Sequence, residues 1–199
     1  MILSVNQGFT YEWANRAFGY VWATFGLVWI AAWGFSKQQA RTIPAIARLL
    51  QSAILLLGFL FIFSPWLRQG LLGRHIWHPS VSLAYAGLVL TCTGVLIAFW
   101  ARYTLGANWS SRPMVKVDHK LIVKGPYRFV RHPIYTGLLL AGSGSAVAVD
   151  EWCILPGLIL VVIGILMKMS QEEQLMTETF PAAYPGYRRH VKALVPFIY

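Results

Sequence analysis

A dense cluster of ionisable and rigid residues stands directly before one of the apolar segments of this chain. It is the stretch Gly125-Pro-Tyr-Arg-Phe-Val-Arg-His-Pro-Ile-Tyr135. Arg131 and His132 supply positive or titratable charge there, while Pro126 and Pro133 restrict the backbone. Ionisable groups next to hydrocarbon are costly, so such a concentration is typical of a functional site. Pro133 also suits the first turn of a helix, whose free N–H groups favour an anionic ligand group such as a carboxylate.

A second group of candidate residues lies towards the C-terminus. Lys168 precedes Glu172 by four residues, which places both side chains on one face of a helix, and Glu173 follows directly. A carboxylate at a membrane surface could face the sulfonium or amine of a cationic cofactor. Both groups also have a purely structural interpretation: snorkelling arginines that anchor the chain, and a surface ion pair of little energetic value.

Metal binding and nucleophilic catalysis find little support in the sequence. His75 and His78 are close together, but no cysteine or carboxylate cluster accompanies them, so we predict no metal site. No serine stands in a recognisable arrangement with a histidine and an acid. Cys92 and Cys153 are isolated in or beside apolar runs, which indicates packing residues and not a disulfide framework.

The composition belongs to the integral membrane class. Of the 199 residues, 57% are hydrophobic and only 12% are charged, whereas soluble domains carry about 25% charged residues. The net charge of +10 comes from basic loops between long apolar runs. A nucleic-acid-binding protein would instead have a polar basic domain, so we expect no nucleic-acid partner. Anionic lipid headgroups explain the charge better.

Five segments approach the roughly 20 apolar residues that a helix needs to cross a bilayer. They are residues 17–36, 43–63, 81–104, 133–149 and 152–168. The last two are joined only by Asp150 and Glu151, which predicts a tight antiparallel hairpin. Residues 168–180 should form a helix that leaves the membrane and ends at Pro181. We therefore predict an all-α integral membrane protein with about five transmembrane helices, in which a cytoplasmic loop and C-terminal helices form the cofactor pocket.

Small residues at helical spacing mark the fourth segment, at Gly137, Ala141 and Ser145, and predict close helix packing. The run Gly-Ser-Gly at 142–144 lies inside this apolar helix, not in a strand-to-helix turn, so it is no dinucleotide fingerprint. The sequence therefore offers no Rossmann domain.

The distribution of Lys and Arg predicts the orientation. With five spans, one side receives 14 of the 17 Lys and Arg residues and the other receives three, namely Arg16, Arg68 and Arg74. The N-terminus is expected outside, and the C-terminus and active site in the cytoplasm. No basic n-region precedes the first apolar run, so no cleaved signal peptide is expected.

The C-terminal half, residues 103–197, resembles the isoprenylcysteine carboxyl methyltransferase family of integral membrane enzymes, which is related to the phospholipid N-methyltransferases. The motifs that carry this resemblance are Leu105-Gly-Ala-Asn-Trp-Ser110, His119-Lys-Leu-Ile122, Gly125-Pro-Tyr127, Arg131-His-Pro-Ile-Tyr135, Glu172-Glu173 with Leu175, and Phe180, Tyr184, Tyr187 and Pro196. The chain is then one membrane domain, in which residues 1–101 form N-terminal helices of unclear role and residues 102–199 the methyltransferase catalytic region.

The resemblance implies an S-adenosyl-L-methionine-dependent methyltransferase that acts on a lipid-like or prenylated acceptor, with carboxyl O-methylation of an isoprenylcysteine-type substrate as the first expectation. The residues that it assigns to the cofactor are His119, Lys120, Leu121, Ile122, Tyr127, His132, Pro133, Ile134, Tyr135 and Glu172. Lys168 and Glu172 are the catalytic candidates, with Lys168 towards the substrate. In the prenylcysteine enzymes an arginine stands where this chain has Lys168, and lysine lacks its bidentate fork. Phospholipid N-methylation is therefore kept as an alternative.

Two other classes compete with this hypothesis. A non-enzymatic membrane transporter or scaffold is one, although no repeat relates the two halves and no ionisable residue lies at the centre of a predicted span. A membrane reductase of sterol or lipid double bonds is the other, and it is expected to span the membrane more often than five times.

Overall fold

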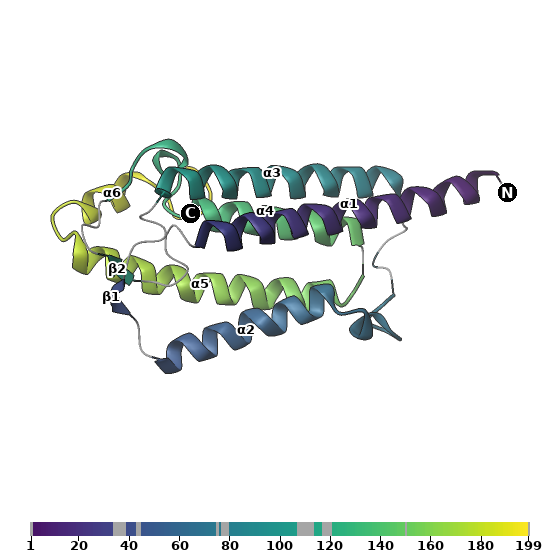
Figure 1. Ribbon diagram of the computed structural model, residues 1–199, viewed down its shortest axis with the longest axis horizontal. Helices are drawn as coiled ribbons and strands as arrows, with labels where there is room; N and C mark the ends of the chain where they lie inside the picture. The colour runs from purple at the N-terminus through teal and green to yellow at the C-terminus, as the bar shows by residue number, and fades with distance from the viewer. Residues whose placement is uncertain are drawn as a thin grey trace.

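The computed structural model describes residues 2–33, 39–42, 45–74, 76, 80–106, 114–116, 121–149 and 151–198. Long helices run lengthwise through the molecule (Figure 1). The elements in chain order are α1 (Ile2–Trp33), β1 (Gln39–Thr42), α2 (Ala45–Phe63), η1 (Pro65–Arg68), α3 (Val81–Leu105), β2 (Met114–Lys116), η3 (Gly125–Arg128), α4 (Pro133–Val149), α5 (Ile154–Thr179) and α6 (Tyr184–His190).

Small residues bring α3 and α4 into close contact, as the spacing in the fourth segment predicts. A Cβ atom added to Gly94 would lie 2.3 Å from the carbonyl oxygen of Gly137, so no larger residue fits there without movement. Thr91 of α3 adds a buried hydroxyl that lies 3.1 Å from the carbonyl of Ala141 and 3.2 Å from Ser145 Oγ. The two backbones can therefore approach closely, and short hydrogen bonds join them.

The helices α2 and α5 form a second pair through the same device. Cβ atoms on Gly58 of α2 or Gly157 of α5 would collide with the facing helix, and Gln51 Nε2 donates to the carbonyl of Gly164 at 3.4 Å. A short connection joins α4 to α5 as predicted, but the two helices do not pack tightly on each other. Instead α4 packs mainly along α3, and α5 packs mainly along α2. Glycines at these contacts let the two helices of each pair approach closely.

Helix boundaries depart from the apolar segments at two places. The helix α1 starts at Ile2, well before the predicted start at residue 17, and α5 continues without a break from Ile154 to Thr179. The length of an apolar segment reflects the thickness of a bilayer, whereas a helix continues until a helix-breaking residue ends it. Pro181 is such a residue after α5. Residues 168–180 therefore extend the fifth helix and are not a separate one.

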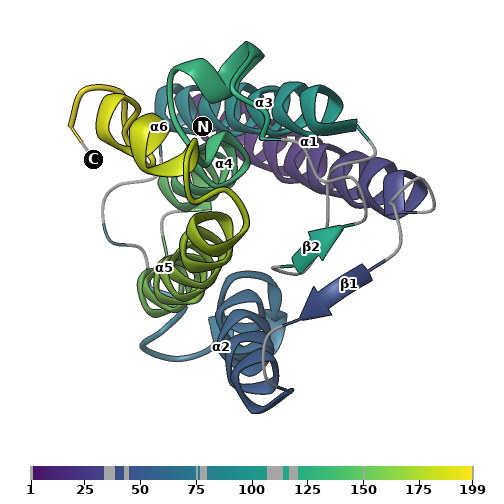
Figure 2. The ribbon, with the colours of Figure 1, turned by 90° about the vertical axis from the view of Figure 1, so that its left-hand side faces the viewer.

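One short antiparallel pair of strands interrupts the helical architecture. Thr42 of β1 pairs with Met114 of β2, and Gln39 pairs with Lys116. Viewed from the left-hand end of Figure 1, this ribbon links the connection after α1 with the connection after α3 (Figure 2). The prediction of an all-helical chain is therefore right for the long elements and misses this pair, whose strands are too short to show a periodic pattern.

Two of the described helices, α3 and α5, are long and apolar enough to cross a membrane. Shorter apolar stretches lie in α1 (Arg16–Ala32), α2 (Leu49–Ile62) and α4 (Pro133–Val149). Length and composition thus qualify two of the five predicted segments as candidate spans.

Candidate active site

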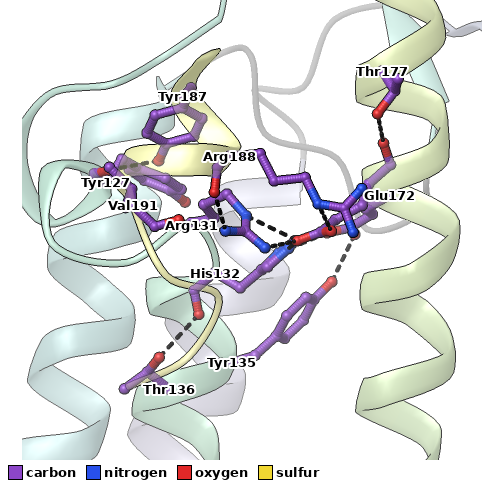
Figure 3. Close-up of polar contacts among 11 residues, drawn as sticks. Tyr127, Arg131, His132, Tyr135, Thr136, Glu172, Thr177, Tyr187, Arg188 and Val191 are labelled. Carbon is purple, nitrogen blue, oxygen red and sulfur yellow. Dashed lines mark hydrogen bonds and ion pairs between the residues drawn. The ribbon is translucent and has the colours of Figure 1, made fainter. Parts of the chain in front are cut away.

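The two groups of residues that the sequence singles out meet in space. Tyr135, in the first turn of α4, donates a hydrogen bond from its hydroxyl to Glu172 Oε1 of α5 at 2.6 Å (Figure 3). His132, which directly precedes α4, lies against the same carboxylate, with Nδ1 3.7 Å from Glu172 Oε2. Tyr135 and His132 precede Glu172 by 37 and 40 positions in the sequence, yet the three residues form one polar cluster at the start of α4.

Glu173 is the centre of the ion-pair network beside this cluster. Arg131 approaches Glu173 Oε1 with Nη2 at 2.6 Å and Nε at 2.9 Å, which is a two-nitrogen contact to a single oxygen. Arg188 of α6 reaches Glu173 Oε2 with Nε at 3.3 Å. Its carboxylate is thus held between two guanidinium groups from separate elements, and it joins α4, α5 and α6.

His132 is placed between two carboxylates. Its Nε2 atom lies 3.2 Å from Glu173 Oε1, while Nδ1 faces Glu172, and the ring stacks on Tyr135 with centroids 5.6 Å apart. Burial of the ring acts to lower the pKa of His132, but the hydrogen bonds and charges of Glu172 and Glu173 outweigh burial, so its pKa is raised. The two carboxylates therefore stabilise the imidazolium form against the cost of burial.

The segment after α6 is fastened to the start of α4 by backbone hydrogen bonds. Arg131 N donates to the carbonyl of Lys192 at 2.8 Å, and His132 N donates to that of Ala193 at 3.0 Å. Thr136 Oγ1 then donates to the carbonyl of Leu194 at 2.7 Å. The C-terminal segment thus runs beside residues 130–136 in the same direction and fixes the backbone on which the site stands.

Arg131 adds side-chain contacts to the same segment. Its Nη1 atom donates to the carbonyl of Arg188 at 3.2 Å and also to that of Val191. The sequence pattern identifies Arg131 as one of several basic residues but does not identify its partners. Arg188 in particular is missed, because its role depends on how α6 folds back onto α5.

Four of the candidate residues belong to one hydrophobic cluster or pack against it. Tyr127, Ile134 and Tyr135 are buried in it, and Ile122 packs against it. Tyr187 donates from its hydroxyl to the carbonyl of Tyr127 at 2.5 Å, which ties α6 to η3. Burial, reinforced by the charge of Glu172, raises the pKa of Tyr127 well above its usual value, so this phenol stays protonated.

The outer members of the predicted set are placed less centrally or fall outside the described residues. Lys168 Nζ lies 5.7 Å from the centroid of the Tyr135 ring, on the α5 turn before Glu172. Pro133 is fully buried at the start of α4, and Leu121 is half-buried before η3. His119 and Lys120 lie outside the residues that the structure describes. Within the described part of the chain, no group of three or more His, Cys, Asp or Glu side chains could hold a metal ion.

Comparisons with known proteins agree with the resemblance seen in the motifs. The model of the isoprenylcysteine carboxyl methyltransferase family matches residues 87–178. A probable protein-S-isoprenylcysteine O-methyltransferase of Oryza sativa subsp. indica is 31% identical over 128 residues, which is 63% of this chain and 65% of that protein. Protein-S-isoprenylcysteine O-methyltransferase A of Arabidopsis thaliana is 28% identical over 142 residues, or 69% of this chain and 66% of the relative. The matches span just under two thirds of these relatives' length.

A solved structure shares the fold. The eukaryotic intramembrane Ras methyltransferase, isoprenylcysteine carboxyl methyltransferase, superposes with a TM-score of 0.50 at 23% identity, over 77% of this chain and 52% of that one. This likeness concerns the fold, and two of the described helices are long and apolar enough to cross a bilayer. Over residues 87–178, which hold most of α3, η3, α4 and nearly all of α5, the chain is therefore similar to the isoprenylcysteine carboxyl methyltransferase family.

Proposed function

We propose that this chain is an S-adenosyl-L-methionine-dependent methyltransferase whose acceptor is a lipophilic molecule in the membrane. The observation that supports it most is the contact of Tyr135 and His132 with Glu172, which joins two sequence motifs of the matched family region into one cluster. The proposed cofactor residues are His119, Lys120, Leu121, Ile122, Tyr127, His132, Pro133, Ile134, Tyr135 and Glu172.

The described residues fit a donor that carries a sulfonium and an amine. Glu172 offers a carboxylate to a cation, and the hydrogen bond from the Tyr135 hydroxyl holds that carboxylate in place. The bound cofactor would supply an activated methyl group, so no protein nucleophile is required. The task of the protein is then alignment of donor and acceptor, which rigid positioning on α4 and α5 serves.

The acid–base state of the cluster favours an acceptor that is already deprotonated. The two carboxylates favour the charged form of His132, and the Tyr127 phenol stays protonated. A carboxylate or thiolate acceptor needs no base, whereas an ammonium group must first lose a proton. We therefore propose carboxyl O-methylation of an isoprenylcysteine-type substrate, with Lys168 facing the substrate carboxylate and Glu172 as the second catalytic residue.

Phospholipid N-methylation is the alternative, because lysine replaces the fork of an arginine at position 168 and is a weaker carboxylate receptor. An amine acceptor would have to lose its proton, and the acceptor itself would be a membrane lipid. Its products differ in the atom that carries the methyl group, so they are separable by mass spectrometry.

The proposed topology has five membrane-spanning segments, with the N-terminus outside and the site on the cytoplasmic side. The acceptor would reach the site laterally from the bilayer, and the water-soluble cofactor would reach it from the cytoplasm. This separation of the two routes explains why such a reaction is placed in a membrane.

Calorimetric titration of the purified chain tests the proposal. We expect binding of S-adenosylhomocysteine and no binding of NADPH. Binding of NADPH alone would favour a lipid double-bond reductase, and binding of neither would favour a transporter or scaffold. An assay with labelled methyl donor over prenylcysteines, prenyl thiols and phospholipids then identifies the acceptor; label that appears only in a methylated amine would replace O-methylation with the alternative.

A further inference from the structure

Two segments that are far apart in the sequence present the same combination of basic and apolar side chains to the outside. From the η3 region these are Lys124, Arg128 and Phe129, and from the C-terminal segment Arg189, Lys192, Val195, Phe197 and Ile198. We call these eight residues the basic–apolar face. Phe197 is 94% exposed and Ile198 is 76% exposed, which is an unfavourable state for such side chains in water.

The fold holds the two segments next to each other. A parallel β-bridge joins Val130 to Lys192, and the Tyr187 hydroxyl donates to the carbonyl of Tyr127 at 2.5 Å. Arg128 also lies over the Phe129 ring, with Cζ 4.5 Å from its centroid. The basic and apolar parts of the face are therefore held together by the fold and not only by proximity in sequence.

The C-terminal segment runs in the same direction as the residues that lead into α4. Lys192 forms a parallel β-bridge with Val130, in the segment just before α4. Two residues further on, the carbonyl of Leu194 accepts a hydrogen bond from Thr136, in the first turn of α4. Figure 1 shows the C-terminus at the same level along the molecule as the first turns of α4, and Figure 2 shows it at the outer edge of the bundle. Lys192 is thus level with Arg131, just before the apolar helix, and Leu194 is level with the first turn of that helix.

No acidic residue occurs in residues 121–130 or 181–198, the two stretches that build the face. Arg188 pairs with Glu173, whereas Arg128, Arg189 and Lys192 are exposed and have no acidic residue among these two stretches. A cluster of cations beside exposed apolar groups, at the level where a helix becomes apolar, matches the boundary between phosphate headgroups and acyl chains.

We propose that the basic–apolar face binds an anionic phospholipid of the surrounding leaflet. The headgroup phosphate lies against Arg128, Arg189 and Lys192, and the acyl chains lie against Phe197 and Ile198. This lipid is a bound component of the membrane and not the methyl acceptor, so the proposal holds for either acceptor class.

Native mass spectrometry of the purified chain in a neutral detergent tests this. Titration with phosphatidylglycerol, phosphatidylcholine and phosphatidylethanolamine gives a dissociation constant for each lipid. We expect phosphatidylglycerol to bind most tightly, and its affinity to fall as salt is added. Removal of two charges in the double variant Arg189→Gln/Lys192→Gln should weaken phosphatidylglycerol roughly fivefold for each charge and leave phosphatidylcholine unchanged.

Arg74→Gln is the matched control, because Arg74 is exposed at the opposite end of the helices. Phe197→Ala should weaken phosphatidylglycerol by about tenfold through lost apolar burial. Equal affinity for the three lipids, or an unchanged phosphatidylglycerol constant in the double variant, would overturn the proposal. So would a dimer mass that Phe197→Ala abolishes, since a second copy would then cover the face. Lipid binding without S-adenosylhomocysteine binding would contradict the proposed function alone.

Discussion

Glu172 and Glu173 are neighbours in sequence with different surroundings. Glu172 receives the Tyr135 hydroxyl and faces His132, which leaves its carboxylate at the proposed cofactor site. Glu173 is held by Arg131, His132 and Arg188 and serves to fasten three elements together. Adjacent helix positions point about 100° apart, so two identical side chains can take one binding role and one structural role.

Glu172→Ala is expected to weaken S-adenosylhomocysteine binding roughly ten- to hundredfold, because a contact to a charged group contributes about 1.5–3 kcal/mol. His132→Ala should also weaken it, through loss of the ring beside that carboxylate. Calorimetry on the purified variants measures both. Glu178→Ala is the control, since Glu178 is an exposed residue of the same helix. Near-normal affinity in both site variants would remove these residues from the cofactor site.

Lys168→Ala should reduce acceptor turnover by about tenfold and change cofactor affinity less, because its charge is proposed to meet the acceptor. Lys168→Arg keeps the charge, adds the bidentate fork and should retain turnover of a carboxylate acceptor. Steady-state kinetics with saturating methyl donor, alongside calorimetry, separate the two effects. A larger loss of cofactor affinity than of turnover in Lys168→Ala would move this residue to the cofactor.

His132 predicts a pH dependence of stability. Its pKa is raised in the folded protein, so the stabilisation that its charge provides is fully present below the unfolded value of 6.5 and is lost as the pH rises through the folded value. The groups that face it are Glu172, Glu173 and the Tyr135 ring, with Arg131 beside Glu173. The difference in melting temperature between wild type and His132→Gln should therefore shrink from about pH 6 to about pH 9.

The exposed His190 supplies the comparison for that measurement. Its substitution, His190→Gln, should produce no comparable trend between the same two pH values. A gap between wild type and His132→Gln that stays constant across this range would show that the charged ring contributes nothing to stability.

At the scale of elements, α4 depends on α3 for its position. The site includes the first turn of α4, and the glycine contacts between α3 and α4 set the distance of that turn from α3. The C-terminal segment then holds the same turn from the other side through Arg131, His132 and Thr136. A change in the helix contact should therefore reach the site without altering any residue in it.

Gly94→Ala tests this dependence. The added Cβ would lie 2.3 Å from the Gly137 carbonyl oxygen, a backbone atom that cannot move alone, so we expect a destabilisation of about 1–3 kcal/mol from overpacking. A lower melting temperature in detergent would show it. Gly142→Ala is the matched control, because its Cβ would meet only Leu158 Cδ1 at 3.5 Å, an ordinary contact. Equal melting temperatures of the two variants would mean that α3 and α4 are not packed this closely.

At the scale of the whole molecule, the asymmetry of charge agrees with the position of the site. The polar cluster, α6 and the basic–apolar face all lie at the end of the bundle where α4 begins (Figure 1). The positive-inside rule predicts that this end faces the cytoplasm. The connection between α2 and α3, at the other end, should then face outward.

Cysteine labelling measures this orientation. Gln69→Cys, in the exposed connection after η1, should react in intact cells with a thiol reagent that does not cross the membrane. Ala182→Cys, exposed between α5 and α6, should react only after the membrane is permeabilised. The unmodified chain, with buried Cys153 and half-buried Cys92, gives the background. The opposite labelling pattern would reverse the topology and place the site outside.

The sequence by itself determined the membrane class, the long helices and the residues worth testing. Apolar runs and charge asymmetry depend on local composition, and the motifs around His132 and Glu172 depend on local order, so both are readable from a single chain. Residues such as Pro133, which begins α4, act through their own backbone and were equally predictable.

Only the tertiary structure decided which elements meet. The pairing of α3 with α4 and of α2 with α5, the ribbon of β1 and β2, and the bonds of Glu173 to Arg131 and Arg188 all join residues distant in sequence. Each depends on how complementary surfaces match once helices have formed, and a glycine face or a carboxylate has several eligible partners along the chain. Helix formation is local, whereas partner choice is settled by packing and charge in three dimensions.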